Sequence, residues 1–467
     1  MLPPTTDRNP GSSGMSDDRP ALAVIRAAIE AGNLVDAAAQ LDLLRTAGIE
    51  SVAVDRLLAE LLWAKQDLDG IQKAFEPMLD SEFDPPRRAV AAFAVARTWY
   101  RGERYIEAAE LALRLANELH AAGVRTSELG LLQCLAGNCA LQLRQLADAR
   151  VCLRRGVSWL ESQGASEAVA DGLLSLSLCA KATSDWDEAE ALNLRALRIY
   201  QELNAARQIL AATTNLAVLR LFRGWFHSAW PLATKAVALA DELGDVRRQG
   251  LTRVNLALLM IRMGDRAGAR AILAQAIRLG RTARNRRVLA LAYEYAGECA
   301  WRDSDQIEAR RWLARAIGLS RSGGERDIEA EASYRLAEVA RDAGDLTSAQ
   351  DWARKALTIC ESIGDEYETA VSRRVLASIL VQLGRPVEAA EMATRSIEYL
   401  NRIRERFELA EARLVLTAAN GRSTSSARAG AQGAPAPPVP STPTEISRRF
   451  PTRHHGCRAR RALPPAD

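Results

Sequence analysis

Polar side chains recur at a 40-residue spacing and offer the clearest binding chemistry in the sequence. Asn215 and Asn255 share one column of this spacing, and Tyr295 and Arg335 continue it. An Asn amide can bond both the N–H and the C=O of an extended peptide, and an Arg can pair with a carboxylate. We therefore expect a partner-binding groove lined by Asn138, Asn215, Arg220, Asn255, Arg262, Tyr295 and Arg335. Tyr293, Glu298 and Glu338 lie nearby, and a solvated groove without a single ligand is the alternative.

Motifs for catalysis, cofactor binding or metal binding are missing from the sequence. It contains no GxxxxGK[ST] phosphate loop, no GxGxxG at a strand–helix junction and no GxSxG nucleophile elbow. His120 and His227 have no paired ligand nearby, and His454–His455–Gly456–Cys457 offers too few ligands for structural zinc. We expect no catalytic residue, no cofactor and no metal, and hence no enzyme.

Cysteines and clustered acids have structural explanations. Cys139, Cys179 and Cys299 share a column that is aliphatic in other repeats, which indicates core packing rather than redox chemistry.

Asp185, Asp187, Glu188 and Glu190 gather at one predicted turn, where acids favour the positive end of the following helix. The spacing of a calcium-binding EF-hand loop is absent.

The elements that position these side chains follow from an internal repeat. A turn and a small residue recur every 40 residues, at Ala149, Ala189, Ala229, Ala269, Ala309, Ala349 and Ala389. A second small column follows seven residues later, at Ala196, Ala236, Ala276, Ala316 and Ala356. Such a period predicts two antiparallel helices per repeat, of about 16–18 residues each after two short turns. Gly-Asp pairs at the turns supply a positive-φ residue and then a helix N-cap.

The predicted fold is therefore all-α, a right-handed α-solenoid of about nine or ten helix pairs. We expect a disordered segment over 1–20, divergent helical repeats over 21–124, a regular array over 125–419 and a disordered Pro/Arg-rich tail over 420–467. Ala37 and Ala108 extend the marker column weakly into the divergent part, whereas Ile71 fits it poorly. Because the composition changes abruptly in mid-repeat, the tail is either genuine or an out-of-frame translation.

The Leu-Ala or Leu-Gly pair, the Gly turn and the Ala-x6-Ala spacing resemble tetratricopeptide repeats. The 40-residue period is similar to the long-helix variety in bacterial regulators, including the MalT-like sensor region; such arrays also precede the ATPase of some sigma-54-type activators. The resemblance implies that the first helix of each pair lines an inner groove. The carboxylate clamp of chaperone-binding tetratricopeptide proteins also needs Lys, and no Lys falls in the groove columns, which disfavours a partner of that kind.

Charge and hydropathy restrict the classes of partner. Eight Arg and two acids follow Ala419, so the other 54 basic and 56 acidic groups nearly balance. We expect no nucleic-acid role for the body and only weak contacts through tail residues such as Arg448 and Arg461. No apolar run approaches the roughly 18–20 residues that span a bilayer, and the seven cysteines are scattered, so we expect a cytoplasmic protein without a membrane partner.

Two functions are consistent with these features. The first is a non-enzymatic scaffold or adaptor that holds a peptide or helix of another protein in the concave groove. The second is the sensor arm of a bacterial transcription or signalling regulator, MalT-like or sigma-54-activator-like, whose effector domain is absent or truncated.

Overall fold

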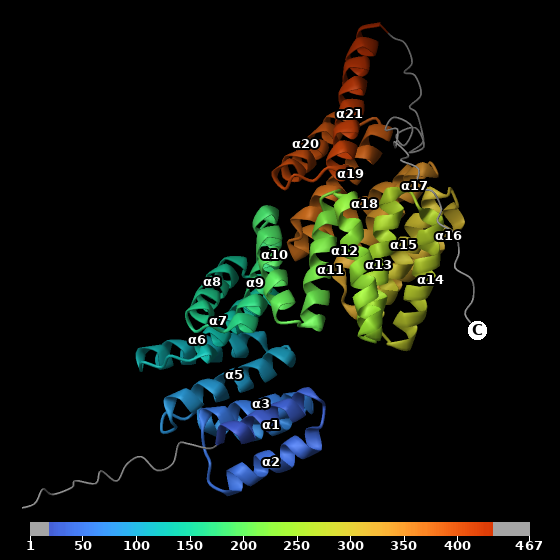
Figure 1. Cartoon of the computed structure of the whole chain (residues 1–467). Coiled ribbons are helices and arrows are strands. Elements are labelled where there is room, and N and C mark those ends of the chain that lie inside the picture. Colours follow the sequence, from blue (N-terminus) through green and yellow to red (C-terminus); the bar gives the residue numbers. More distant parts are fainter. Residues whose placement is uncertain (1–17, 433–467) are drawn as a thin grey trace, which may run out of the picture.

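The computed structural model describes residues 18–432, and this part of the chain is entirely helical. Between Asp18 and Gln432 it contains 21 α-helices and one 3-10 helix, with no strand. Consecutive helices pack against each other in antiparallel pairs, and the pairs stack into an extended solenoid (Figure 1). The predicted all-α solenoid is confirmed.

The helices divide into a short N-terminal group and a regular array. The N-terminal group consists of α1 (Asp18–Glu30), α2 (Leu34–Thr46), α3 (Val52–Ala64), α4 (Leu68–Phe75), and the 3-10 helix η1 (Glu76–Leu79). The first half of the array consists of α5 (Pro85–Arg101), α6 (Tyr105–Ala121), α7 (Ser127–Gln142), α8 (Leu146–Ser162), α9 (Ser166–Ala182), α10 (Trp186–Glu202), α11 (Ala206–Phe222) and α12 (Phe226–Glu242). The second half consists of α13 (Val246–Met263), α14 (Arg266–Thr282), α15 (Arg286–Arg302), α16 (Gln306–Gly323), α17 (Arg326–Asp342), α18 (Leu346–Ile363), α19 (Glu366–Gln382), α20 (Pro386–Arg402) and α21 (Phe407–Gln432).

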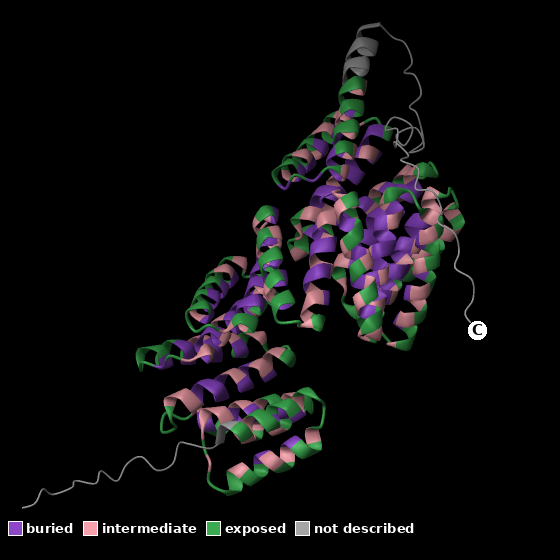
Figure 2. Cartoon of the chain, viewed as in Figure 1, coloured by how far each residue is buried: buried purple, intermediate pink, exposed green. Residues whose placement is uncertain are grey.

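The small-residue columns lie where the two helices of a pair touch. The seven marker alanines from Ala149 to Ala389 are at most 1% exposed, and the second column from Ala196 to Ala356 is at most 2% exposed. Buried residues form a continuous band along the array (Figure 2). Because Ala has no side chain beyond Cβ, these columns let the helix axes approach closely. The predicted register of helix pairs is therefore correct.

The turns have the predicted chemistry. Gly264 has φ 90° and Gly344 has φ 82°, conformations that residues with a Cβ seldom adopt. The next residue is the N-cap in each case: Asp265 accepts from the N–H of Gly268, and Asp345 from that of Ser348. Each turn thus ends one helix and begins the next within three residues.

The N-terminal repeats diverge in length. Helices α1 to α3 have 13 residues and α4 has eight, whereas α5 to α20 have 16 to 18. Ala37 and Ala108 are nevertheless fully buried, as the weak extension of the marker column predicted. Ile71 is also buried, and its larger side chain lies in the short helix α4.

The C-terminal boundary needs one correction. We expected helical structure to stop after Ala419, but α21 continues to Gln432. The segment from Gly421 to Gln432 contains no proline, and a helix already formed adds residues at low cost. The predictions for 1–17 and 433–467, including the histidines and arginines of the tail, lie outside the described residues.

The array bends back on itself, so distant repeats touch. Arg144 Nη2 donates to the carbonyl oxygen of Gly364 at 2.5 Å, and the N–H of Arg406 donates to that of Arg223 at 3.3 Å. Gly224 fits closely here, since a Cβ on it would lie 3.0 Å from the backbone nitrogen of Phe407. We call this contact the closure; it joins the stretch from the α7–α8 turn to α12 with the stretch from the α18–α19 turn to α21, and it is visible where α10 approaches α19 and α20 (Figure 1).

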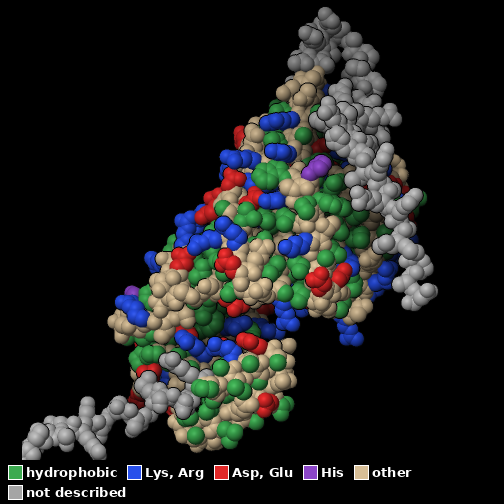
Figure 3. Space-filling model, in the orientation of Figure 1, with side chains coloured by type: hydrophobic (Ala, Val, Ile, Leu, Met, Phe, Trp, Pro, Cys, Tyr) green, Lys and Arg blue, Asp and Glu red, His purple; other side chains and the backbone are tan. Residues whose placement is uncertain are grey.

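The surface carries both signs of charge. Basic and acidic side chains alternate over the visible face, as the near balance of charge in the body predicted (Figure 3). Within residues 18–432, none of the helices has the length and apolar character needed to cross a membrane.

Candidate functional site

A cavity of about 400 Å³ that is partly open to solvent lies where the two sides of the closure meet. First helices of successive pairs supply most of its wall, namely α9, α11, α13, α15, α17 and α19. Trp186 of α10 and Tyr399 of α20 complete it at the closure. We call this space the central cavity, and its position confirms that first helices face inward.

Asn215 and Asn255 lie side by side in register on α11 and α13 and line the central cavity. Both are half-buried. Neither side-chain amide hydrogen-bonds to any other group in residues 18–432. The two side chains therefore present two C=O groups as acceptors and two NH₂ groups as donors to whatever occupies the cavity.

Aromatic side chains form another part of the wall. Tyr295 of α15 lies in the same column as the two asparagines and is 4% exposed. Tyr367 of α19 packs at ring-centre distances of 5.5 Å from Trp186 and 5.3 Å from Phe222. Because these rings come from both sides of the closure, they join the two ends of the array across the cavity.

Arg262 and Arg335 are two of the expected groove residues, but they do not line the central cavity. They line a smaller inner recess of about 20 Å³, where Arg335 is 3% exposed. Arg335 pairs with Glu294 at 2.6 Å and Glu298 at 2.7 Å, and Arg262 pairs with Glu298 at 2.7 Å. Both guanidinium groups are therefore held by carboxylates of this chain. Their ion pairs link α13, α15 and α17 behind the wall of the central cavity.

Electrostatics in this network favour ion pairs. Burial raises the pKa of Glu298, but Arg262, Arg335 and Arg302 outweigh burial and hold the pKa of this carboxyl below its ordinary value. Burial lowers the pKa of Arg335, and Glu298 and its neighbours outweigh that effect and hold the pKa well above its ordinary value. Glu298 and Arg335 are thus both charged over the physiological range.

Two other predicted residues lie away from the cavity. Arg220 of α11 donates to Glu190 at 2.9 Å and also to the carbonyl oxygen of Ser228. Asn138 of α7 is half-buried and is not part of the cavity wall. The structure thus brings together Asn215, Asn255 and Tyr295, places Arg262 and Arg335 behind them, and separates Arg220 and Asn138 from them.

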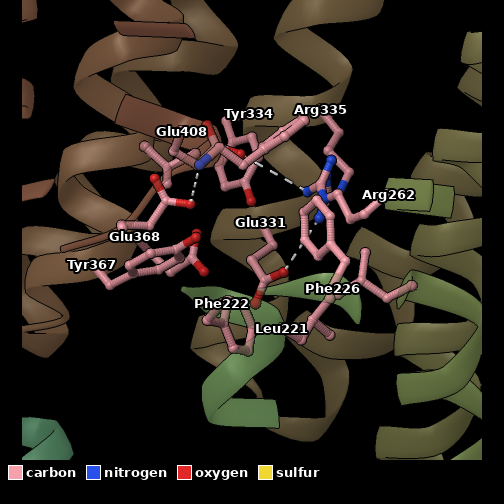
Figure 4. Close-up of a pocket in the computed structure, with 14 residues that line it drawn as sticks. Leu221, Phe222, Phe226, Arg262, Glu331, Tyr334, Arg335, Tyr367, Glu368 and Glu408 are labelled. Carbon is pink, nitrogen blue, oxygen red and sulfur yellow. Dashed lines mark hydrogen bonds and ion pairs between the residues drawn. The ribbon is translucent and has the colours of Figure 1, made fainter. Parts of the chain in front are cut away.

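Sequence reasoning missed three glutamates at the cavity. Glu331 and Glu368 line both the central cavity and the inner recess, and the carboxyl group of Glu294 on α15 contacts that of Glu331 from behind. Figure 4 shows the side chains of Glu331, Glu368 and Tyr367 directed toward one another. Burial, followed by the charge of Glu331, raises the pKa of Glu368 and of Glu294 well above the ordinary value.

A sequence signal for these glutamates exists. The positions 40 and 80 residues before Glu368 hold Ile328 and Val288, and those before Glu331 hold Leu291 and Leu251. An acid that replaces an aliphatic residue in a core column is costly unless the site uses it. Comparing columns across repeats would therefore have singled out both glutamates.

Other predictions made from single residues can also be compared with the structure. Asp185 caps α10, but the acids after it form ion pairs as well: Glu188 with Arg150 and Arg154, and Asp187 with Arg223. Cys139, Cys179 and Cys299 are buried, as predicted. The six cysteines within the described residues are all buried free thiols: Cys134, Cys139, Cys152, Cys179, Cys299 and Cys360. Burial raises the pKa of Cys139 to about 12, which disfavours the reactive thiolate.

The predictions about metal sites and histidines can be compared with the structure only for residues 18–432. No group of three His, Cys, Asp or Glu between residues 18 and 432 is arranged to hold a metal ion. His227 is exposed in the first turn of α12.

Residues 329–402, which span α17 to α20, match the family model described as tetratricopeptide repeat. The chain carries tetratricopeptide repeats (TPRs). No curated protein matches it in sequence. The likeness to MalT-like regulators stays a prediction.

Solved structures share the TPR-like solenoid fold at low sequence identity. The apo form of the quorum sensor NprR from B. thuringiensis aligns with a TM-score of 0.55 and 13% identity, over 73% of this chain and 98% of that one. A Rap protein complexed with competence and sporulation factor gives 0.53 and 13%, over 80% and 99%. Aspartyl phosphate phosphatase F from Bacillus subtilis gives 0.50 and 13%, over 85% and 97%.

Proposed function

We propose that this TPR array is a non-enzymatic binding module that holds a peptide segment of a partner protein in the central cavity. The observation that carries the proposal is the pair of amides on Asn215 and Asn255. They lie 40 residues apart on adjacent first helices, face the same cavity and have no partner within residues 18–432. An extended peptide main chain supplies alternating donors and acceptors that satisfy both amides.

The size and construction of the cavity support a short peptide. A volume of about 400 Å³ falls in the range of sites that bury most of a small ligand. Its aromatic wall offers apolar contact area, and the inner ion pairs hold that wall rigid. A preformed site loses less conformational entropy on binding than one that orders with its ligand.

The sensor arm of a regulator is a second candidate. It is supported by the fold shared with the quorum sensor NprR and with the Rap protein complexed with competence and sporulation factor. In this version of the proposal the bound peptide is a signal rather than a docking segment. Six buried free thiols fit a reducing compartment, and we propose the cytoplasm for both candidates.

The test uses a displayed library of random heptapeptides selected on the full-length protein. The variants Asn215→Ala and Asn255→Ala each remove one amide, and we expect each to weaken a selected peptide by about tenfold. Asn138→Ala is the matched control, because that residue lies outside the cavity wall. Peptides whose affinity is unchanged by both cavity variants would overturn the proposal.

A further inference from the structure

Glu368 is a buried carboxyl group whose side chain has no hydrogen-bond or ion-pair partner among residues 18–432. It is 5% exposed, and its Oε2 has no hydrogen-bond partner although it lies at the junction of the central cavity and the inner recess. Leaving such a group unpaired in a protein interior is costly. Its neighbour Glu331 lies against the carboxyl group of Glu294 and 3.6 Å from Nη2 of Arg335. Glu368 therefore retains unused acceptor capacity at the cavity.

Three other charged groups of the central cavity have partners. Arg287 pairs with Glu325 and Asp327, and Glu366 pairs with Arg402 at 2.9 Å. Asp365 caps α19 by accepting from the N–H of Glu368. None of these three groups is paired with the carboxyl of Glu368.

Two cations on the facing wall do not neutralise these glutamates. Arg144 donates to the carbonyl oxygen of Gly364. The ammonium of Lys181 lies 5.2 Å from the ring centre of Phe222 and forms no ion pair among the described residues. Neither cation is among the charged groups that most shift the pKa of Glu331 or of Glu368.

Aromatic rings surround the same space. Tyr295 and Tyr367 line the central cavity beside the glutamates, and Phe222 faces them from α11 (Figure 4). The electron-rich faces of such rings attract cations, most strongly where water is excluded. Carboxylates combined with ring faces suit a guanidinium or an ammonium group.

We propose that Glu331 and Glu368 form a binding site for a cationic group, a guanidinium or an ammonium, presented to the central cavity. Resting on the proposed function, we assign this group to a basic side chain of the bound peptide. A free polyamine or amino acid offers the same chemistry, so the experiment includes both sources. The main chain of the peptide then lies along Asn215 and Asn255, with its basic side chain at the junction.

Binding of a cation changes the protonation of the site. Burial, then Glu331 and Asp365, raise the pKa of Glu368 well above its ordinary value, which favours the protonated carboxyl when the cavity holds no cation. An entering cation favours the carboxylate and displaces protons. The titratable and charged groups that face Glu368 from the surrounding helices are Glu294, Tyr295, Glu331, Tyr334, Arg335, Cys360, Asp365 and Tyr367.

The experiment selects random heptapeptides in parallel on the wild type and on Glu368→Gln. The variant keeps the size of a protonated carboxyl and lacks its charge, and Glu331→Gln provides a second, independent variant. We expect Arg or Lys at one fixed position of the peptides selected on the wild type and no such preference on either variant. Replacing that Arg by citrulline should weaken wild-type binding at least tenfold and leave binding to Glu368→Gln unchanged.

Calorimetry separates this site from a general effect on folding. Titrations of the Arg peptide in two buffers of different ionisation enthalpy should show proton release with the wild type and none with Glu368→Gln. Glu398→Gln on the exposed face of α20 is the control and should behave as the wild type. Agmatine and spermidine are titrated separately, and tighter binding of either than of the Arg peptide would assign the site to a free amine.

Failure of the two proposals can be distinguished. Peptides that need Asn215 and Asn255 but show no basic preference would overturn the cation site and leave the proposed function intact. If no peptide depends on the asparagines, the proposed function is wrong. The cation site is then tested by the titration of agmatine alone. Agmatine binding that Glu368→Gln abolishes then supports the site, and no binding overturns it.

Discussion

Arg335 of α17 and Glu294 of α15 form a buried ion pair between adjacent first helices, with Nε of Arg335 2.6 Å from Oε1 of Glu294. Glu298 completes the pair at 2.7 Å from Nη1 of Arg335. In a solenoid stabilised mainly by thin aliphatic interfaces, this network fixes the wall of the central cavity from behind. Arg335 was predicted to contact the ligand. In the structure it instead positions the side chains that line the cavity.

Removing this arginine should be strongly destabilising. Arg335→Met leaves Glu294 and Glu298 buried without their shared cation, and we expect the free energy of unfolding to fall by about 3–5 kcal/mol. Urea denaturation followed by circular dichroism measures the loss. The exposed Arg278 of α14 is the control, and Arg278→Met should change stability by less than about 0.5 kcal/mol. Equal effects of the two variants would contradict a stabilising role of the network.

The small-residue columns give a second prediction. Ala269→Trp inserts a large ring where α14 meets its partner helix and should lower the free energy of unfolding by about 1–3 kcal/mol. Ala267 is exposed two residues earlier, so Ala267→Trp tests the same chemical change without the interface. Thermal unfolding compares the two. An unchanged melting temperature of Ala269→Trp would show that the helix register is wrong.

Glu405 predicts a pH dependence of stability. Burial, then the charge of Glu408, raises the pKa of Glu405 to about 7, although the N–H groups of Phe407 and Leu409 donate to it. Because the pKa in the folded state exceeds that of an ordinary Glu, the stabilising contribution is complete below about pH 4.5 and is lost as pH rises through about 7.

Glu405→Gln should remove this contribution. Between pH 5 and pH 8 the wild type should lose about 2.5 kcal/mol more free energy of unfolding than the variant does. Urea midpoints at the two pH values provide the comparison, with Glu398→Gln as an exposed control. A variant whose pH dependence equals that of the wild type would assign the dependence to other carboxyls.

The closure should depend on Phe407. Its ring lies 5.9 Å from that of Phe226, and the guanidinium of Arg262 lies 5.0 Å from its centre. Phe407→Ala removes these contacts of α21 with α12 and α13 and should widen the array, so small-angle scattering should report a larger radius of gyration. Phe83→Ala alters an exposed ring in the N-terminal part and should leave the radius unchanged. A compact Phe407→Ala variant would show that other contacts suffice to hold the closure.

Periodicity predicted the helix pairs, the alanine columns and the capped turns because these depend on contacts within one repeat or between neighbours. Periodicity could not predict the closure, because Arg144 and Gly364 are 220 residues apart and their contact depends on the accumulated rotation between repeats. The same limit explains the candidate site. Asn215, Asn255 and Tyr295 were found from one column. Glu331 and Glu368 stand out as acids in aliphatic columns, but only the folded structure shows that they face the same cavity.

The crystal structure of the full-length protein bound to a selected heptapeptide tests the central claim most directly. The account predicts that the peptide occupies the central cavity, with its main chain hydrogen-bonded to Asn215 and Asn255 and a basic side chain beside Glu331 and Glu368. A peptide bound on the outer surface, with the central cavity unchanged, would contradict it.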